Sequence, residues 1–396
     1  MDNNTKTSSG NLLRRSSLGK KIRKNRTKQF PVFAAVAPGF SQTAEKEAAS
    51  KLKGITNLHI TKGGISFNTD IEGIIKANLL LGVPSGILVR LNKFRAQNFD
   101  ELFKNTSEIP FELFFKKNAF LKIRVSSRKS KLIHTKAVEE NIRKALSNRL
   151  EKNESLISDE SGLNPELYVR ISSDNVTVSV DSSGEPLHKR GLKKFVSKAP
   201  IRENIAAAAL IKSGYKGENP FFDPMSGTGT FSIEAALCAS SIPPGYFRRF
   251  SFEDWPLFSS DIYESVKKTF SENITKPGSL ILASDIDPEN LFLLKKNLAG
   301  THPDKFVMKY CADFFSLTTK FKKGTIALNP PYGLRLGRDQ GMIKNIEKKL
   351  KNDFKGFRLI LTIPKDFSSG YFSGKHFDKT PFVHGGIEMN LFTGKI

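Results

Sequence analysis

The stretch FFDPMSGTGT, residues 221–230, decides the fold of the second half of this chain. It predicts a short buried strand that ends at Asp223, a tight turn, and a helix over residues 231–239. Glycines at 227 and 229 let the backbone approach a ligand closely at the amino end of that helix. The turn lacks the Gly-Lys-Ser/Thr ending of a phosphate-binding loop and the third glycine of a dinucleotide fingerprint. We therefore expect a ligand without phosphates at this turn.

Acidic residues follow the next two predicted strands. Residues 279–284 predict a strand that ends at Asp285, where a carboxylate can accept both hydroxyls of a ribose. Residues 306–310 predict a third strand that ends near Asp313, placed to accept from an adenine amino group. Asp also caps helices and turns, so each residue alone is a weak signal. Three acids at three successive strand ends, with the glycine turn, indicate a nucleoside site.

The segment Asn329-Pro330-Pro331-Tyr332-Gly333 follows a fourth predicted strand, residues 324–328. Consecutive prolines donate no backbone hydrogen bond and hold φ fixed, which leaves the Asn side chain and the neighbouring carbonyls as a stiff cluster of acceptors. Such a cluster suits an exocyclic amino group, and the Tyr ring can stack on a flat heterocycle, a contact worth about 1–3 kcal/mol per base. A proline-rich turn whose Tyr merely packs is the alternative. We predict that Asn329, Pro330, Pro331 and Tyr332 are the catalytic residues.

The rest of the second half completes a parallel sheet, with a strand at 357–363 and a hairpin at 376–382 and 386–392. Residues 240–278 are an insertion whose aromatic residues are expected to pack. The first half predicts an α+β unit. Its expected strands are 32–36, 58–60, 65–67, 87–91, 120–125, 167–172 and 176–181, and its expected helices are 41–53, 71–80 and 135–150.

The charge of the chain favours a polyanionic partner. There are 63 Lys and Arg against 39 Asp and Glu, a net charge of +24. Residues 1–29 carry nine basic residues and one acid, which predicts a flexible basic arm, and residues 151–164 predict a polar linker. Residues 116–136 hold eight basic residues and no acid. The candidate nucleic-acid contacts are Lys122, Arg124, Arg128, Lys129, Lys131, Arg190, Arg248 and Arg249.

Several classes of protein fit the sequence poorly. No apolar run approaches the ~20 residues of a membrane helix, and the amino terminus lacks the apolar core of a secretory signal. Two cysteines are too few for a disulfide framework or a zinc site. His188 has no second His or Cys nearby in sequence, which favours a structural or RNA-contacting role over metal binding, so no metal site is expected. A reducing cytoplasm is the compartment that fits best.

These motifs resemble those of class I S-adenosylmethionine-dependent RNA methyltransferases with an N-terminal THUMP domain, specifically the bacterial large-subunit ribosomal RNA guanine-N2 methyltransferases. Residues 223–230 are similar to the methionine-binding turn of that family, with Ser226 where Cys is more common. Residues 329–333 look like its amino-methyltransferase motif, 181–191 and 199–203 its linker signatures, and 111–150 its THUMP sequences. The resemblance implies an α/β chain with a ferredoxin-like and THUMP RNA-binding domain at 30–185 and a Rossmann-like methyltransferase domain at 186–396.

The resemblance also implies the cofactor and the substrate. S-adenosylmethionine would be held by Pro200, Ile201, Asp223, Pro224, Ser226, Gly227, Gly229, Thr230, Asp285, Ile286, Asp313, Phe314 and Asn329. The acceptor would be N2 of a guanosine in 23S ribosomal RNA, flipped out of its helix. Methylation of adenine N6 or of transfer RNA stays open, as does a non-catalytic RNA-binding assembly factor. A DNA adenine methyltransferase and a nucleotide-dependent oxidoreductase are further alternatives.

Overall fold

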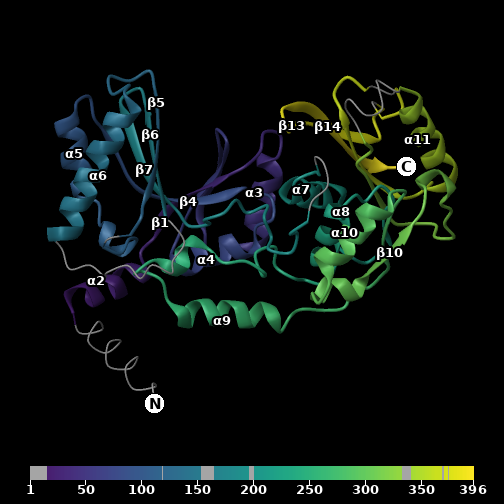
Figure 1. The fold of residues 1–396 in the computed structure, drawn as a ribbon, viewed down its shortest axis with the longest axis horizontal. Helices are drawn as coiled ribbons and strands as arrows, with labels where there is room; N and C mark the ends of the chain where they lie inside the picture. Colours follow the sequence, from purple (N-terminus) through teal and green to yellow (C-terminus); the bar gives the residue numbers. More distant parts are fainter. Residues whose placement is uncertain are drawn as a thin grey trace, which may run out of the picture.

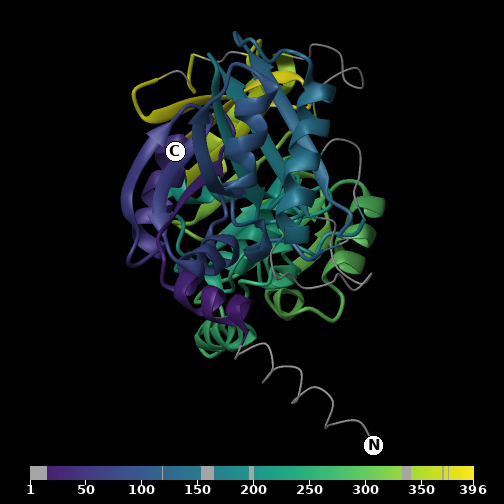
Figure 2. The same cartoon turned by 90° about the vertical axis from the view of Figure 1, so that its left-hand side faces the viewer.

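The computed structural model describes residues 16–117, 119–152, 165–195, 200–331, 340–367, 370–372 and 374–396. These residues form two seven-stranded sheets that lie side by side, the first at the left of Figure 1 and the second at the right. Figure 2 views the first half from its outer side, with the second half behind it. No helix in the described ranges combines the length and apolar character that crossing a membrane requires.

The first sheet has the order β2-β3-β1-β4-β7-β6-β5. Strand β5 runs parallel to β6, and the other neighbours pair antiparallel. The strands are β1 (Phe30–Ala35), β2 (Thr56–Thr61), β3 (Gly64–Thr69), β4 (Gly86–Arg95), β5 (Lys122–Arg128), β6 (Glu166–Ser172) and β7 (Asn175–Asp181). The helices are α3 (Ser41–Lys51), α4 (Ile71–Leu80), α5 (Phe99–Ser107) and α6 (Thr135–Lys152). The sequence analysis missed α5, although Asn98 caps it and Asp100 and Glu101 stand in its first turn.

The second sheet has the order β10-β9-β8-β11-β12-β14-β13. Its first five strands run parallel, and the terminal hairpin joins β12 antiparallel. The strands are β8 (Phe221–Asp223), β9 (Ile281–Asp285), β10 (Val307–Cys311), β11 (Thr325–Leu328), β12 (Arg358–Pro364), β13 (Phe377–His384) and β14 (Ile387–Lys395). The helices are α7 (Glu203–Ser213), α8 (Thr230–Ala239), α10 (Pro288–Leu298) and α11 (Gln340–Asp353). The predicted parallel α/β sheet is thus confirmed.

Side chains on the two faces of this sheet enter different hydrophobic clusters. Phe221 joins the cluster under α7, α8 and α10, whereas Phe222 joins the one under α11. Alternate residues of a strand point to opposite faces, so a strand covered on both faces reads as a continuous apolar run. Because the first five strands of the sheet run parallel, their carboxyl ends meet at one edge of the sheet.

The insertion between α8 and β9 connects the two halves. It contains α9 (Ser260–Ser271), which lies below α4 in Figure 1 and contacts it. The amide of Gly245 donates to the carbonyl of Leu79 (2.9 Å), and the Trp255 ring meets the Phe114 ring edge-on at 5.1 Å between centroids. The aromatic residues of the insertion therefore pack, as predicted, and one hydrophobic cluster runs through both halves.

The expectation of a flexible arm over residues 1–29 is wrong for its second part. Residues 1–15 lie outside the described ranges, but Ser17–Arg26 form helix α2, which begins at a Ser16 cap and lies beside the start of α9 (Figures 1 and 2). Leu18 and Ile22 are buried, and the Arg26 Nη2 donates to the carbonyl of Phe258 (3.0 Å). Two apolar side chains four residues apart on one helix face outweigh the charge of the segment, because they find a hydrophobic surface in the tertiary structure.

A buried carboxylate anchors α2. Glu112 accepts from Lys21 of α2 and from Arg149 of α6, whose Nη2 lies 2.8 Å from Oε1. Burial alone would raise the pKa of Glu112, but the hydrogen bonds from Arg149 and Lys21 outweigh it and lower the pKa below its ordinary value. Such an acid stabilises the fold above its unfolded pKa, and the stabilisation is lost as pH falls through the folded pKa.

We expect Glu112→Gln to lower the free energy of unfolding by about 1–3 kcal/mol at pH 7. The difference from the wild type should shrink as the pH falls below about 4.5, the ordinary pKa of the group. Urea unfolding of both proteins at pH 7 and pH 4 measures this. Equal differences at both pH values would contradict the role of the ionised carboxylate.

Candidate active site

A pocket of about 1100 Å³ opens at the carboxyl edge of the second sheet. Strand β8 lies between β9 and β11, so the turn after β8 faces the ends of both neighbours. The walls combine the predicted cofactor residues other than Asp223 and Gly229 with positions that the sequence analysis missed. The predicted residues are Pro200, Ile201, Pro224, Ser226, Gly227, Thr230, Asp285, Ile286, Asp313, Phe314 and Asn329. The additional ones include Phe231, Asp287, Glu289, Asn290, Leu293, Phe315 and Met342.

The glycine turn is shaped by the carboxylate of Asp285. Its Oδ2 accepts from the amide of Gly227 (2.7 Å), and its Oδ1 accepts from the amide of Asp287 (3.0 Å) and the side chain of Asn290 (3.2 Å). Gly227 and Gly229 have φ of +54° and +83°. Asp285 thus holds the turn in a conformation that glycine adopts easily. Its predicted bonds to ribose hydroxyls stay a prediction. Both lone pairs of Oδ1 are already used by these donors, and Oδ2 keeps one lone pair for a further donor.

We expect Gly229→Ala to weaken binding of S-adenosylhomocysteine at least tenfold. A Cβ at this position would lie 2.3 Å from the Cδ1 of the buried Leu294, so the Leu294 side chain, α10 or the turn must shift. Gly300→Ala is a matched control, because Gly300 also has a positive φ (+73°) but no atom within 4 Å of the added Cβ. Isothermal titration calorimetry of both variants measures the effect, and equal affinities would contradict it.

Asp223, which the sequence analysis expected to contact the cofactor, does not line the pocket, and that contact stays a prediction. It is 1% exposed and stands beneath the turn, where its Oδ2 accepts from the amide (3.0 Å) and hydroxyl (2.6 Å) of Ser232. Burial raises the pKa of Asp223 to about 7. This side chain fixes the start of α8 instead of lining the pocket.

A buried lysine supports the same helix and was missed. The Lys193 Nζ donates to the Thr230 Oγ1 (2.6 Å) and lies 3.3 Å from the Glu203 Oε1, and burial lowers the pKa of the amine. Within the run Lys189–Lys194 nothing in the sequence separates Lys193 from its exposed neighbours. Its position depends on contacts with α7 and α8.

The predicted catalytic segment begins at the pocket wall. Asn329 and Pro331 reach the pocket beside Pro330, which is buried, whereas Tyr332 lies outside the described residues. The Thr362 hydroxyl donates to the Asn329 Oδ1 (2.7 Å). Thr362 is fully buried in β12, and the sequence analysis missed it, although a hydroxyl within the apolar strand 358–364 is a signal. The bond orients the Asn329 amide and leaves one Oδ1 lone pair for another donor.

The other walls of the pocket are largely apolar. Ile286 is 69% exposed, and Phe314 is buried beside Phe354. The Nε2 of His384 lies 3.1 Å from the carbonyl of Pro200, which fixes the segment before α7 against β13.

Within the described ranges, His, Cys, Asp and Glu form no group of three that could hold a metal ion.

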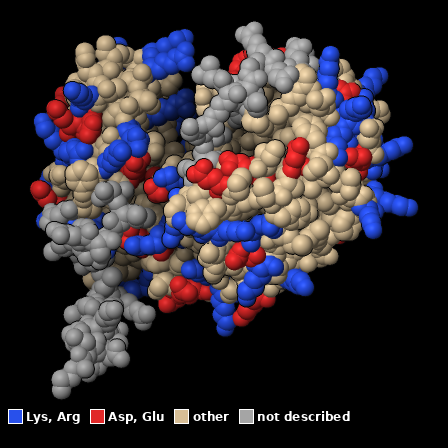
Figure 3. All heavy atoms as spheres, turned by 45° about the vertical axis from the view of Figure 1, so that its right-hand side comes forward, with Lys and Arg blue, Asp and Glu red and all other residues tan. Residues whose placement is uncertain are grey.

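The predicted RNA contacts of the first half divide into residues paired with an acid, Lys122 and Arg124, and residues on an exposed loop. Arg124 donates to Glu166 through Nε (2.6 Å) and Nη2 (2.9 Å), and the Nζ of Lys122 lies 3.6 Å from the same carboxylate. The loop with Arg128, Lys129 and Lys131 is exposed, and Asp174 holds it by accepting from the Lys131 amide (2.8 Å). Figure 3 shows Lys and Arg projecting from both halves of the molecule.

Two predicted RNA contacts in the second half are wrong. Arg190 is 3% exposed, and its guanidinium donates to Glu234 (3.0 Å) and to two carbonyls. Arg248 donates to the carbonyls of Pro186 (2.8 Å), Lys189 (3.0 Å), Ser183 (3.0 Å) and Glu185 (2.5 Å). Both guanidiniums satisfy backbone acceptors in the linker before α7. Arg249 is exposed and pairs with Asp254 (3.1 Å), so its RNA contact stays a prediction.

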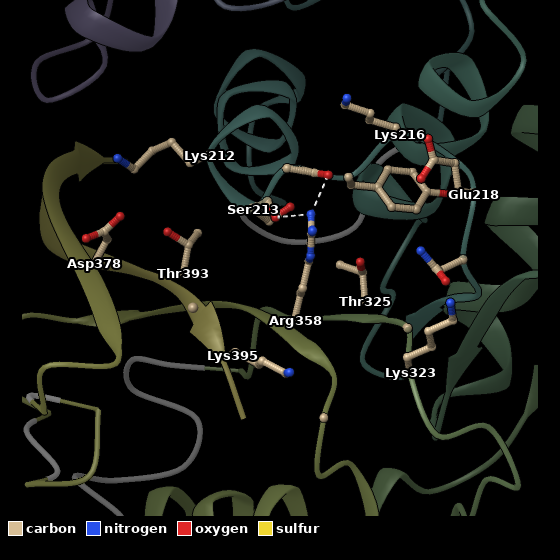
Figure 4. A pocket seen from close by; sticks show the side chains of 16 residues that line it. Lys212, Ser213, Lys216, Glu218, Lys323, Thr325, Arg358, Asp378, Thr393 and Lys395 are labelled. Carbon is tan, nitrogen blue, oxygen red and sulfur yellow. Dashed lines mark hydrogen bonds between the residues drawn. The ribbon is translucent and has the colours of Figure 1, made fainter.

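A second pocket, of about 650 Å³, lies at the opposite edge of the sheet. The polar side chain at its centre, Arg358, has a role in the fold. Figure 4 shows the Arg358 guanidinium directed at the end of α7, where Nη1 donates to the carbonyls of Ser213 (2.9 Å) and Gly214 (2.5 Å). A cation at a helix carboxyl end satisfies the free carbonyls and offsets the helix dipole. The glycine turn and Asn329 do not line this pocket.

Two segments of the chain match known domain families. Residues 190–378 match the RMKL-like methyltransferase domain, and residues 96–181 match the THUMP domain. The putative RNA methyltransferase YpsC of Bacillus subtilis (strain 168) is 30% identical over 341 residues, which cover 84% of this chain and 88% of that protein.

A longer relative is the ribosomal RNA large subunit methyltransferase K/L of Buchnera aphidicola subsp. Acyrthosiphon pisum (strain APS). It is 26% identical over 383 residues, 90% of this chain and 53% of that protein, so this chain spans about half its length. The crystal structure of SMU.472, a putative methyltransferase complexed with SAH, superposes with a TM-score of 0.81 at 27% identity and covers 93% of this chain and 98% of that one. The chain therefore belongs to the family of RMKL-like methyltransferases that carry a THUMP domain.

Proposed function

We propose that this chain transfers a methyl group from S-adenosylmethionine to the exocyclic N2 of a guanosine in large-subunit ribosomal RNA. Its family makes it an S-adenosylmethionine-dependent RNA methyltransferase. The observation that carries the finer proposal is that one pocket joins the glycine turn to Asn329 and Pro330. The names of the K/L relatives support ribosomal RNA, and the resemblance of residues 329–333 supports an exocyclic amine as acceptor.

The pocket fits the cofactor by the chemistry of its walls. Main-chain groups of the glycine turn suit the methionine part, and Asp285 and Asp313 at neighbouring strand ends suit the ribose hydroxyls and the adenine amino group. Ile286 and Phe314 offer apolar surface to the adenine ring. When bound, S-adenosylmethionine supplies an electrophilic methyl group on its sulfonium sulfur.

The residues of the chain prepare the acceptor. The lone pair of an exocyclic guanine nitrogen is delocalised into the ring, which makes it a weak nucleophile. When the Asn329 Oδ1 and the Pro330 carbonyl accept the two amino protons, the lone pair becomes more localised and is oriented. The rate gain then comes from positioning and electrostatic placement, and no strong base is required. Stacking of the flipped base on Tyr332 stays part of the proposal.

Mass spectrometry of nucleosides from cells with and without the gene tests this function. The expected result is the loss of one N2-methylguanosine from large-subunit ribosomal RNA, with transfer RNA unchanged. Loss of N6-methyladenosine, or a loss confined to transfer RNA, would overturn the proposed base or substrate. Unchanged nucleosides in both RNA pools would contradict RNA methylation and favour an assembly factor or a DNA substrate.

A further inference from the structure

Two exposed phenylalanines flank one lysine beside the pocket. Phe292 of α10 is 55% exposed and Phe195 is 43% exposed. The Lys296 Nζ lies 4.5 Å from the ring centroid of Phe292 and 5.4 Å from that of Phe195. Single exposed apolar residues are common and carry no information. Two rings bridged by one cation form a defined surface, which we name the Phe195–Lys296–Phe292 platform.

A buried amide holds one side of this platform in place. Asn297 is 4% exposed, and its Oδ1 accepts from the amides of Lys194 and Phe195, both at 2.9 Å. Its Nδ2 donates to the carbonyl of Phe195 (2.8 Å). Three hydrogen bonds from one buried side chain therefore fix the backbone that carries an exposed ring. Such an arrangement preorganises a contact surface, because the ordering cost is met before a partner arrives.

The platform lies on the face of α10 next to the pocket. Glu289 and Leu293 line the pocket, and Phe292 and Lys296 each follow one of them by three residues. Residues three apart on a helix are surface neighbours, so the platform adjoins the pocket wall. A nucleic-acid strand whose target base enters the pocket would pass this surface with an adjacent nucleotide.

The charge around the platform indicates the class of partner. Lys194, Lys295 and Lys296 are exposed, and none of them forms a salt bridge with another residue in the part of the chain that the structure describes. Aromatic faces stack on any base, and neighbouring cations attract the phosphates on both sides of it. A protein partner is the alternative occupant, which would need apolar contact area but neither ring geometry nor phosphate.

We propose that the Phe195–Lys296–Phe292 platform stacks an unpaired RNA base next to the nucleotide that enters the pocket. This inference rests on the proposed function, because it assumes an RNA substrate. It adds a second contact for the strand, outside the pocket and separate from the basic loop of the first half. The rings hold the base and the lysines hold its phosphates.

Matched substitutions of Phe292 test the stacking. Fluorescence anisotropy is measured with a labelled large-subunit RNA fragment that the wild-type protein methylates. Phe292→Leu keeps apolar surface but removes the ring, and we expect it to weaken binding about 5- to 100-fold. Phe292→Trp keeps a stacking face and should stay within about threefold of the wild type. Affinity for S-adenosylhomocysteine, measured by calorimetry, should be unchanged in both variants.

The salt dependence separates the roles of the rings and the lysines. Loss of a ring should leave the slope of log Kd against log salt unchanged, whereas Lys296→Gln should reduce its magnitude by ~0.7–0.9. If Phe292→Leu binds RNA as tightly as the wild type, the platform does not stack a base and faces a protein partner instead. If the wild-type protein methylates no RNA, the proposed function fails first, which distinguishes the two failures.

Discussion

Replacement of Asn329 with alanine is expected to lower kcat for RNA methylation by about 10²–10³-fold, the effect of removing one preorganised polar group from a reacting centre. Affinity for RNA and for S-adenosylhomocysteine should change by less than ~3-fold, because the glycine turn, the strand-end acids and the basic surfaces remain. Single-turnover methylation and separate binding measurements provide the test. An equal loss of RNA affinity and of activity would show that Asn329 serves binding and not the transfer.

Thr362 supplies a graded control for this prediction. Thr362→Val removes the hydroxyl that donates to the Asn329 Oδ1 (2.7 Å) and keeps the shape of the side chain. We expect a smaller fall in kcat, about tenfold, with KM nearly unchanged, because the amide loses its orientation but stays in place. Thr362→Ser keeps the donor and should retain activity. Equal activities of the valine and serine variants would contradict a positioning role.

Arg190→Met is expected to cause the largest loss of stability, about 3–5 kcal/mol. Arg190 and Glu234 are 2% and 3% exposed in their side chains, and the two groups lie 3.0 Å apart. The guanidinium also donates to the carbonyls of Gly82 (2.8 Å) and Leu187 (2.7 Å), so it connects the first half, the linker and α8. Removing it leaves a buried carboxylate and two buried carbonyls without their donor. The midpoint of urea unfolding measures the loss.

The pH dependence of the stability of Arg190→Met shows whether the unpaired Glu234 carboxylate causes the loss. Burial raises the pKa of Glu234, and Arg190 partly offsets this rise. In Arg190→Met that offset is lost. An acid whose folded pKa is raised loses stability as pH rises, so Arg190→Met should be closer to the wild type at pH 5 than at pH 8. The double variant Arg190→Met/Glu234→Met removes the unpaired charge and should recover much of the loss. A double variant as unstable as the single one would show that the hydrogen bonds to Gly82 and Leu187 dominate.

Much of the architecture followed from local sequence. The strands around Gly227, Asp285 and Asn329, the terminal hairpin and most helices of the first half lie close to their predicted residues. These elements are set by apolar periodicity, caps and turn chemistry, which act between residues a few positions apart. The same rules predicted that the glycine turn and the other strand ends lie at one edge of the sheet, because parallel strands all have their carboxyl ends at the same edge.

The sequence by itself determined the parallel sheet, the glycine turn and the residues that follow its strands. The tertiary structure alone decided that Arg190 is a buried ion pair, that Asp223 stands beneath the turn, and that Thr362 orients Asn329. It also decided that the basic segment 17–26 packs as a helix. The physical reason is the range of the interactions: Arg190 meets a carboxylate 44 residues away and Thr362 an amide 33 residues away. A charged or polar residue has the same local signature whether such a distant partner buries it or water surrounds it.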